Sequence, residues 1–395
     1  MRYITRYVLS EVIVVFGMAL FGMTLFMILV GVVIEAVRQG LGPEPILRLV
    51  PYLIPNALVF AVPGALLFAV CTVYGRMAAA NEFVAVKSLG VSPMSMLWPG
   101  VMFAFFTSLS AVWLNDLAAS WGREGIQRVI MESMEQIVYG TLRTHRAHRA
   151  NDKLAITVRR VDGRKLISPT ISTLDGRGRS VTITAREAEL QSRPENNALV
   201  LRLWDPVIET GDRGRLTWPG LLEQEIPLRD AVKGGDQGKH PTEYAIRQIP
   251  VEINAQRKSL HEHEQAMATS AACQLFTGDF SALSQGEWSG KHHVLRSGRG
   301  RLHRLHCEPY RRWANGFSCF FFVWVGAPLA VRLRNSDLMT TFGLVFLPVL
   351  LLYYPLMAYG VDRAKTGEFP PYAVWIGNII LFFLGFYLLR RVMRY

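Results

Sequence analysis

Six long stretches without a charged residue are the feature that most constrains how this chain of 395 residues can fold. Each stretch has between 19 and 28 residues, whereas an apolar run of about 18 is already long enough for a membrane-spanning helix. Between Asp116 and Arg312 the longest such stretch, Gln265–Gly278, has only 14 residues. The pattern therefore predicts three spans, an insert and three more spans. The six stretches are Val12–Ile34, Leu49–Gly75, Ser88–Asn115, Trp313–Val331, Leu338–Val361 and Phe369–Leu389.

The composition supports a membrane protein and excludes an ordinary soluble enzyme. Charged residues make up 19% of the chain, whereas soluble globular proteins carry roughly 25%. The predicted fold class is a helical membrane protein with an inserted antiparallel β domain. Transmembrane helices 1–3 are expected in residues 1–115, the insert in 116–312, and transmembrane helices 4–6 in 313–395.

The basic residues of the short loops predict the orientation. With the N-terminus inside, the short inner segments carry nine Lys and Arg residues and the short outer loops carry four. Because short loops rich in Lys and Arg stay in the cytoplasm, both termini are expected there, with residues 116–312 on the outer side of the membrane. The net charge of +12 is therefore not interpreted as a nucleic-acid signature.

Two patterns divide the insert. From about residue 150 to 230, apolar and polar residues alternate, as at Leu154, Ile156 and Val158. Such alternation predicts several short antiparallel strands in a sandwich, jelly roll or curved half-barrel. A helical or irregular link is expected over about 250–312, helical from Pro250 to about Phe276 and poorly structured over Gly278–His306.

A search for catalytic or cofactor chemistry favours a chain with no active site of its own. No phosphate-binding loop is present, since the nearest strings fail in glycine spacing and lack the hydroxyl residue. The chain is therefore not expected to bind ATP or another cofactor. His261 and His263 are two residues apart, which places them on different helix faces, so no metal site is predicted.

Two further features of the insert leave alternatives open. The basic run from His292 to His306 could hold lipid phosphates near a membrane, or it could be a solvated loop. Cys273 and Cys307 lie in a region where an oxidising compartment would permit a disulfide. The sequence does not decide whether they pair.

The inner loop between the second and third spans predicts a short surface helix over about 77–90. Asn81 is a possible N-cap, Gly90 a possible C′ residue and Pro93 a stop, while Glu82 is the one acidic residue. A transporter without a nucleotide site must receive force through such a surface element. The alternative is a simple interfacial turn, and the residues alone leave both open.

Several motifs resemble those of the lipopolysaccharide-export permease family (LptF/LptG, also called YjgP/YjgQ). The inner loop is similar to the family's Glu…Ala…Gly-Val-Ser segment, which matches Glu82 and Gly90–Ser92. Arg312 resembles the family's arginine before the fourth span, and Gly326, Pro328 and Leu329 resemble its Gly-x-Pro-Leu motif. The likeness covers both membrane halves, and is weak over about 234–306.

This resemblance implies a permease subunit of an ABC transporter. It would pair with a sister permease and bind a cytoplasmic ATPase dimer, extract lipopolysaccharide from the inner membrane and pass it to a periplasmic bridge. A single-span subunit that anchors the bridge is a further possible partner. The resemblance makes 77–90 the coupling helix, with Glu82, Arg76, Lys87 and Gly90 as coupling residues.

The resemblance also places Arg38 where family members hold lipid phosphates, with an ordinary interfacial arginine as the alternative. Two alternative functions stay open: a lipoprotein-release or other efflux permease, and a membrane scaffold that transports nothing. The sequence does not tell which of the two sister subunits this is, nor which sugars the cargo carries.

Overall fold

The computed structural model of the chain forms two compact units, which are described separately. The first comprises Met1–Met27, Ile54–Gly122 and Lys239–Tyr395, and the second comprises Ile28–Leu53 and Arg123–Gly238. The structure describes residues 2–39, 43–133, 138–139, 142, 147–151, 154–174, 180–193, 198–210, 215–227, 240–278, 286–333 and 338–394.

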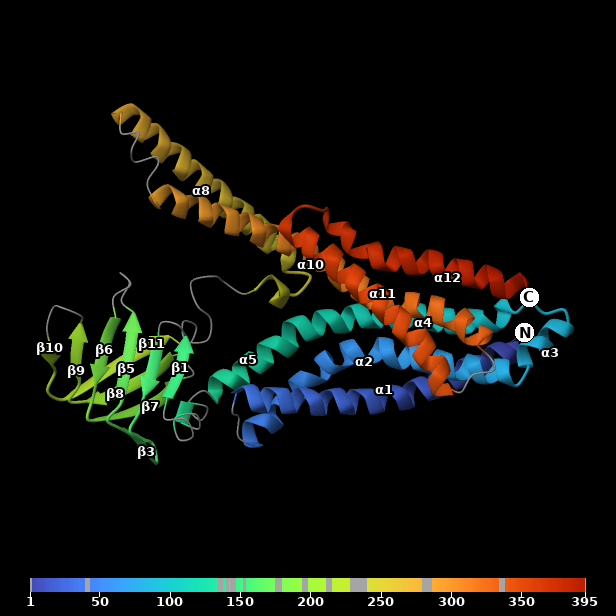
Figure 1. Cartoon of the computed structure of the whole chain (residues 1–395), viewed down its shortest axis with the longest axis horizontal. Helices are drawn as coiled ribbons and strands as arrows, with labels where there is room; N and C mark the ends of the chain where they lie inside the picture. Colours follow the sequence, from blue (N-terminus) through green and yellow to red (C-terminus); the bar gives the residue numbers. More distant parts are fainter. Residues whose placement is uncertain are drawn as a thin grey trace. The chain divides into compact units, whose positions relative to one another are not determined.

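Six helical segments of the described chain are long and apolar enough to cross a membrane, which confirms the predicted architecture (Figure 1). In the third of them, α4, the π-helical turn η1 and α5 follow one another without a break, so the helix continues past Asp116. The helices are α1 (Arg2–Gln39), α2 (Pro43–Ala79), α3 (Glu82–Ser88), α4 (Met94–Leu117), η1 (Ala118–Gly122), α5 (Arg123–Glu132), α8 (Ile249–Thr277), α10 (Gly286–Arg332), α11 (Leu338–Thr366) and α12 (Ile376–Arg394), with the 3₁₀ turns η4 (Pro241–Glu243) and η5 (Pro371–Trp375).

The core of the first unit lies where α2, α4 and α10 meet. Leu66, Leu67 and Val70 of α2 are fully buried, as are Cys319 and Val323 of α10. These residues come from uncharged stretches of both halves of the chain, so the two halves share one apolar core. Burial of this kind stabilises a helix bundle through close packing and dispersion contacts.

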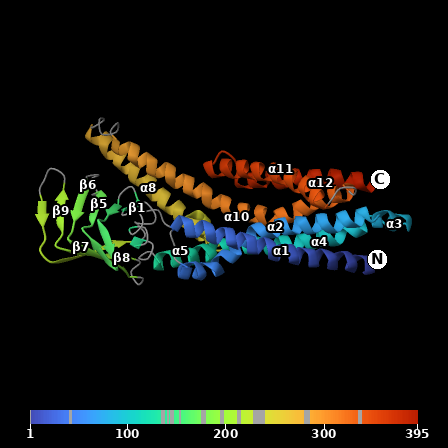
Figure 2. The ribbon, with the colours of Figure 1, turned by 60° about the horizontal axis from the view of Figure 1, so that its bottom comes forward.

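The irregular segment predicted over Gly278–His306 is wrong from Gly286 onward, because α10 begins there and continues for 47 residues. Residues 279–285 lie outside the described part of the chain. At 1.5 Å per residue such a helix is about 70 Å long, more than twice the roughly 30 Å of a hydrocarbon core. Its first part runs antiparallel to α8, as Figures 1 and 2 both show. Glycines and histidines made this segment look irregular in sequence, but its neighbour α8 stabilises the helix.

Specific contacts hold this helical hairpin together. Arg299 forms an ion pair of 2.8 Å with Glu264, and the Trp288 indole donates to Gln274 Oε1 at 3.0 Å. At Gly298 a Cβ atom would lie 2.8 Å from Leu260 Cδ2, so glycine permits the close approach of α8 and α10. The helix predicted from Pro250 to about Phe276 is confirmed as α8.

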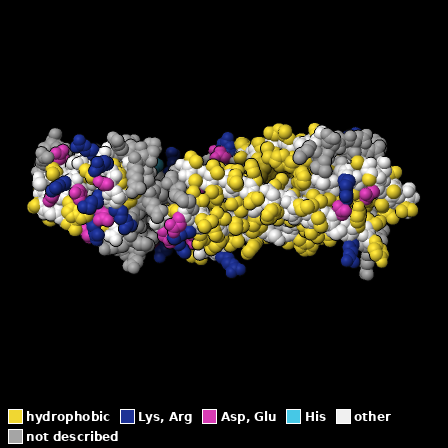
Figure 3. Space-filling model, turned by 90° about the horizontal axis from the view of Figure 1, so that it is seen from below, with side chains coloured by type: hydrophobic (Ala, Val, Ile, Leu, Met, Phe, Trp, Pro, Cys, Tyr) yellow, Lys and Arg dark blue, Asp and Glu magenta, His cyan; other side chains and the backbone are white. Residues whose placement is uncertain are grey.

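Hydrophobic side chains cover the outside of the helices as well as their core. One face shows a broad band of them, with the visible Lys, Arg, Asp and Glu side chains mostly outside it (Figure 3). On α1, Phe21 is 73% exposed and Met18 is 64% exposed. A helix that is apolar on its outer side is suited to lipid or to partner helices.

The helical part of the second unit has its own small apolar cluster. Leu49 and Leu53 near the start of α2 pack with Val129 of α5. Gly125 lies against the ring of Tyr52, where a Cβ atom would come within 1.9 Å of Cδ1. The absence of a side chain at Gly125 therefore allows this helix contact.

The strands of the second unit form two antiparallel sheets. One has the order β1-β2-β5-β6-β9-β10 and the other β11-β8-β7-β4-β3, so successive hairpins alternate between the sheets. The strands are β1 (Ala147–Asn151), β2 (Leu154–Thr157), β3 (Arg160–Asp162), β4 (Lys165–Ile167), β5 (Thr170–Leu174), β6 (Ser180–Thr184), β7 (Glu187–Arg193), β8 (Ala198–Trp204), β9 (Val207–Thr210), β10 (Arg215–Thr217) and β11 (Leu221–Pro227).

Residues of both sheets contribute to one core, in which Leu166, Ile171, Leu190 and Leu203 are buried. The Tyr139 hydroxyl accepts a hydrogen bond from the Leu190 amide at 3.0 Å, which satisfies a buried polar group. The prediction of antiparallel strands over about 150–230 is confirmed. The more specific jelly-roll topology stays a prediction.

Candidate functional site

The candidate site is built around α3, the short helix between α2 and α4. It is shorter than the predicted 77–90, because Met77–Ala79 still belong to α2. The helical geometry is interrupted at Asn81, whose φ is 58°. Asn81 precedes the helix as predicted, but its side chain makes no capping hydrogen bond. The left-handed conformation at Asn81, which Asn tolerates better than most residues, sets the change of direction.

Gly90 ends α3 as the sequence predicts. Its φ is 75°, a region that favours glycine. Its amide donates to the Lys87 carbonyl at 3.0 Å, and the Val91 amide donates to the Val86 carbonyl at 3.2 Å. These two bonds are the Schellman pattern, which satisfies the last carbonyls of a helix.

Buried aromatic residues fix α3 to the helices on either side of it. Phe83 is buried and its ring lies 6.3 Å from that of Tyr74 on α2. The buried Tyr74 hydroxyl lies 3.2 Å from the carbonyls of both Met96 and Leu97 at the start of α4. At Gly100 a Cβ atom would come within 2.3 Å of this hydroxyl, so only glycine leaves room for it.

The predicted coupling residues occupy different faces of this region. Glu82 is half-buried at the start of α3, and Lys87 is exposed near its end. Arg76 forms an ion pair of 2.7 Å with Glu11 of α1, a partner that no local pattern predicts. Two apolar residues also face outward, Val84 at 55% and Leu89 at 79% exposed. Exposed apolar side chains at a surface helix can form part of an interaction surface.

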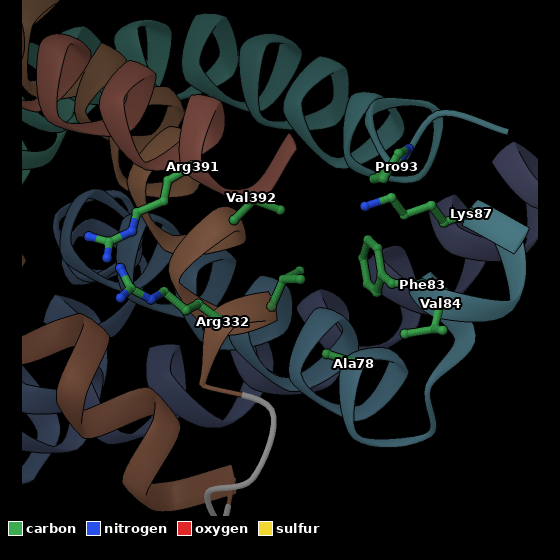
Figure 4. A pocket seen from close by; sticks show the side chains of 9 residues that line it. Ala78, Phe83, Val84, Lys87, Pro93, Arg332, Arg391 and Val392 are labelled. Atoms are coloured by element: carbon green, nitrogen blue, oxygen red, sulfur yellow. The ribbon is translucent and has the colours of Figure 1, made fainter. Parts of the chain in front are cut away.

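Next to α3 lies a cavity of about 360 Å³ with three basic side chains (Figure 4). Arg332 ends α10 and Arg391 lies in the last turn of α12, and their guanidinium groups point toward one another. Lys87 extends toward the same space from α3. Nothing local in the sequence indicates that the ends of these distant helices meet here. The other lining residues are Ala78, Phe83, Val84, Pro93, Val331 and Val392.

The Gly-x-Pro-Leu motif lies inside α10, where this helix contacts α2. At Gly326 a Cβ atom would come within 2.5 Å of Leu67 Cδ1 and 3.5 Å of Val345 Cγ1. Pro328 lies in the helix without ending it, and Leu329 packs against the core. The motif is therefore a packing feature of the bundle in this structure.

Arg312 joins three segments of the first unit through a buried ionic cluster. Its side chain is 2% exposed and pairs with Asp116 of α4 at 2.5 Å. It also donates to the Tyr244 carbonyl at 2.7 Å, while Glu308 lies 3.8 Å away on the same helix. The Ile246 amide donates to Asp116 at 2.8 Å. Arg312 thus connects α4, the segment after η4 and α10.

Other predicted residues have no clear role in the described structure. Arg38 lies in the last turn of α1, and its side chain is outside the described part of the chain. His261 and His263 are exposed on α8, and the described residues contain no group of three or more His, Cys, Asp or Glu that could hold a metal ion. Cys273 and Cys307 are both free thiols, Cys273 exposed and Cys307 buried.

The fold and this site define a class: an integral membrane protein with two groups of three spans and an antiparallel β insert between them. The sequence profile described as "Lipopolysaccharide export system permease LptF/LptG" matches residues 2–391. The chain therefore belongs to the LptF/LptG family of lipopolysaccharide export permeases. Comparison with curated proteins gives no match.

Proposed function

We propose that this chain is the permease subunit of an ABC transporter that extracts lipopolysaccharide from the inner membrane and passes it to a periplasmic bridge. The family supports a role in lipopolysaccharide export. The observation that carries the proposal further is α3, an aromatic-anchored helix with Glu82 half-buried and Val84 and Leu89 exposed. Such a surface can transmit movement from a partner, because Phe83 and Tyr74 connect it to the bundle.

In this proposal a cytoplasmic ATPase dimer supplies ATP binding and hydrolysis, and a sister permease completes the membrane part. Glu82 would accept a hydrogen bond from a basic residue of the ATPase, a contact strengthened by its charge. Lys87 and Arg76 would flank that contact, and Gly90 would set the end of the docking helix. Both termini would lie in the cytoplasm and the β insert in the periplasm, as the loop charges predict.

The test is co-purification of the ATPase with the membrane-extracted chain, together with an export assay in cells. Glu82→Arg reverses the charge in the proposed contact, and we expect it to reduce ATPase recovery about tenfold or more. Glu44→Arg is the matched control, since Glu44 is exposed in the first turn of α2 and pairs only with Arg48 among the described residues. Unchanged recovery and normal export for Glu82→Arg would refute the coupling role of α3.

A further inference from the structure

The cavity beside α3 brings three cations to one level of the bundle. Lys87 directly precedes the uncharged stretch Ser88–Asn115, Arg332 directly follows Trp313–Val331, and Arg391 lies two residues after Phe369–Leu389. Each cation therefore lies where an apolar, membrane-length run begins or ends. At that level of a bilayer the hydrocarbon gives way to phosphate groups.

The charged side chains that line the cavity, among the described residues, are all basic. Of the nine described residues that line it, three are basic, six are apolar and none is acidic. The guanidinium groups of Arg332 and Arg391 point toward one another, and none of the described lining residues places a carboxylate between them (Figure 4). Two like charges that face each other in this way are stabilised by a shared anion, which two guanidinium groups can bind with several hydrogen bonds.

The apolar wall indicates what kind of anion fits. Phe83, Val84 and Val392 add hydrocarbon surface to the cavity that holds the basic groups (Figure 4). Val331 lines the same cavity. A soluble anion would leave that surface without a partner, whereas a lipid has a phosphate and an apolar portion side by side. The volume of about 360 Å³ is within the range of small-molecule sites, roughly 300–1,000 Å³.

We propose that this cavity binds the headgroup phosphate of an anionic phospholipid from the cytoplasmic leaflet. Basic pockets between transmembrane helices on the cytoplasmic side are suited to such headgroups. The bound phosphate would bridge the ends of α10 and α12, with Lys87 of α3 close enough to contribute. The lipid would then stabilise the position of α3 relative to these helices. The orientation of this site in the membrane rests on the proposed topology.

Native mass spectrometry of the full-length chain in detergent, with phosphatidylglycerol and phosphatidylethanolamine of identical acyl chains, tests this site. We expect phosphatidylglycerol to be retained in preference, and Arg332→Gln with Arg391→Gln to lower its bound fraction about tenfold or more. Arg332→Lys with Arg391→Lys keeps the charges and should retain part of the binding. Free inorganic phosphate should not displace the lipid.

The matched control is Arg6→Gln with Arg390→Gln, which removes two exposed arginines of α1 and α12 that do not line the cavity. Equal lipid loss in this control, or no preference for phosphatidylglycerol in the unaltered chain, would overturn the proposal. In the separate co-purification assay, a Gln pair that keeps the lipid but loses the ATPase would also overturn it, because the cavity would then be a protein-docking site. The lipid measurement itself uses neither transport nor the ATPase, so its failure can be told apart from failure of the proposed function.

Discussion

Gly326 and Arg312 both lie on α10, and each is required for a different physical reason. At Gly326 the issue is space, since a Cβ atom would come within 2.5 Å of a Leu67 methyl group. At Arg312 the issue is charge, since the buried guanidinium pairs with Asp116 and donates to a backbone carbonyl. Neither residue contacts the cavity or α3 in the described structure, so both are expected to act through stability.

We expect Gly326→Ala to lower the free energy of unfolding by about 1–3 kcal/mol, because Leu67 and its neighbours must move to accept the added methyl group. Thermal unfolding of the purified chain in detergent measures this. Gly343→Ala on α11 is the control, since nothing lies within 4 Å of a Cβ atom there. Equal stability of the two variants would show that the contact with α2 can relax without cost.

We expect Arg312→Ala to lower the free energy of unfolding by about 3–5 kcal/mol. Asp116 would lose its ion-pair partner, while the buried Glu308 would keep only its ion pair with Arg311. Arg304→Ala, an exposed position on the same helix, should change stability by only about 0.5 kcal/mol or less. The same unfolding measurement compares them. A small effect at Arg312 would mean that water or rearrangement replaces the ion pair.

At the scale of elements, α3 is a helix of only seven residues, and the residues at its two ends determine where it starts and stops. A helix of this length has little stability of its own in water. The left-handed residues Asn81 and Gly90 bound it, and Phe83 anchors it by contact with Tyr74. Its orientation therefore depends on its contacts with α2 and α4 rather than on the helix itself.

Gly90→Val tests this view of α3. A β-branched residue at a φ of 75° is strained by about 1–2 kcal/mol, so the end of the helix should rearrange. We expect reduced ATPase co-purification with Gly90→Val and near-normal recovery with Gly90→Asn, because Asn tolerates the left-handed region. If both variants recover the ATPase equally, the Schellman end of α3 is not needed for docking.

At the scale of the whole molecule, the proposed partners depend on the membrane topology, because a cytoplasmic ATPase can reach α3 only if α3 lies on the cytoplasmic side. Three of the four cysteines are buried, and Cys273 on α8 is exposed. The chain therefore carries a natural reporter on the predicted periplasmic side.

We expect a membrane-impermeant maleimide to label Cys273 in spheroplasts without permeabilisation. Leu89→Cys, an exposed position on α3, introduced together with Cys273→Ser, should be labelled only after the membrane is permeabilised. Labelling is read by mass shift of the purified chain. The reverse pattern would invert the topology and place α3 away from any cytoplasmic ATPase.

The sequence alone determined the number and order of the spans, the antiparallel strands, α8 and the glycine end of α3. These are local properties: a run of apolar residues partitions into lipid wherever it lies, and a positive φ favours glycine wherever it occurs. The tertiary structure decided the continuity of α10, the pairing of Arg76 with Glu11, and the meeting of Lys87, Arg332 and Arg391 in one cavity. Those depend on which helices pack together, and such contacts between distant segments leave no periodic signal in the chain.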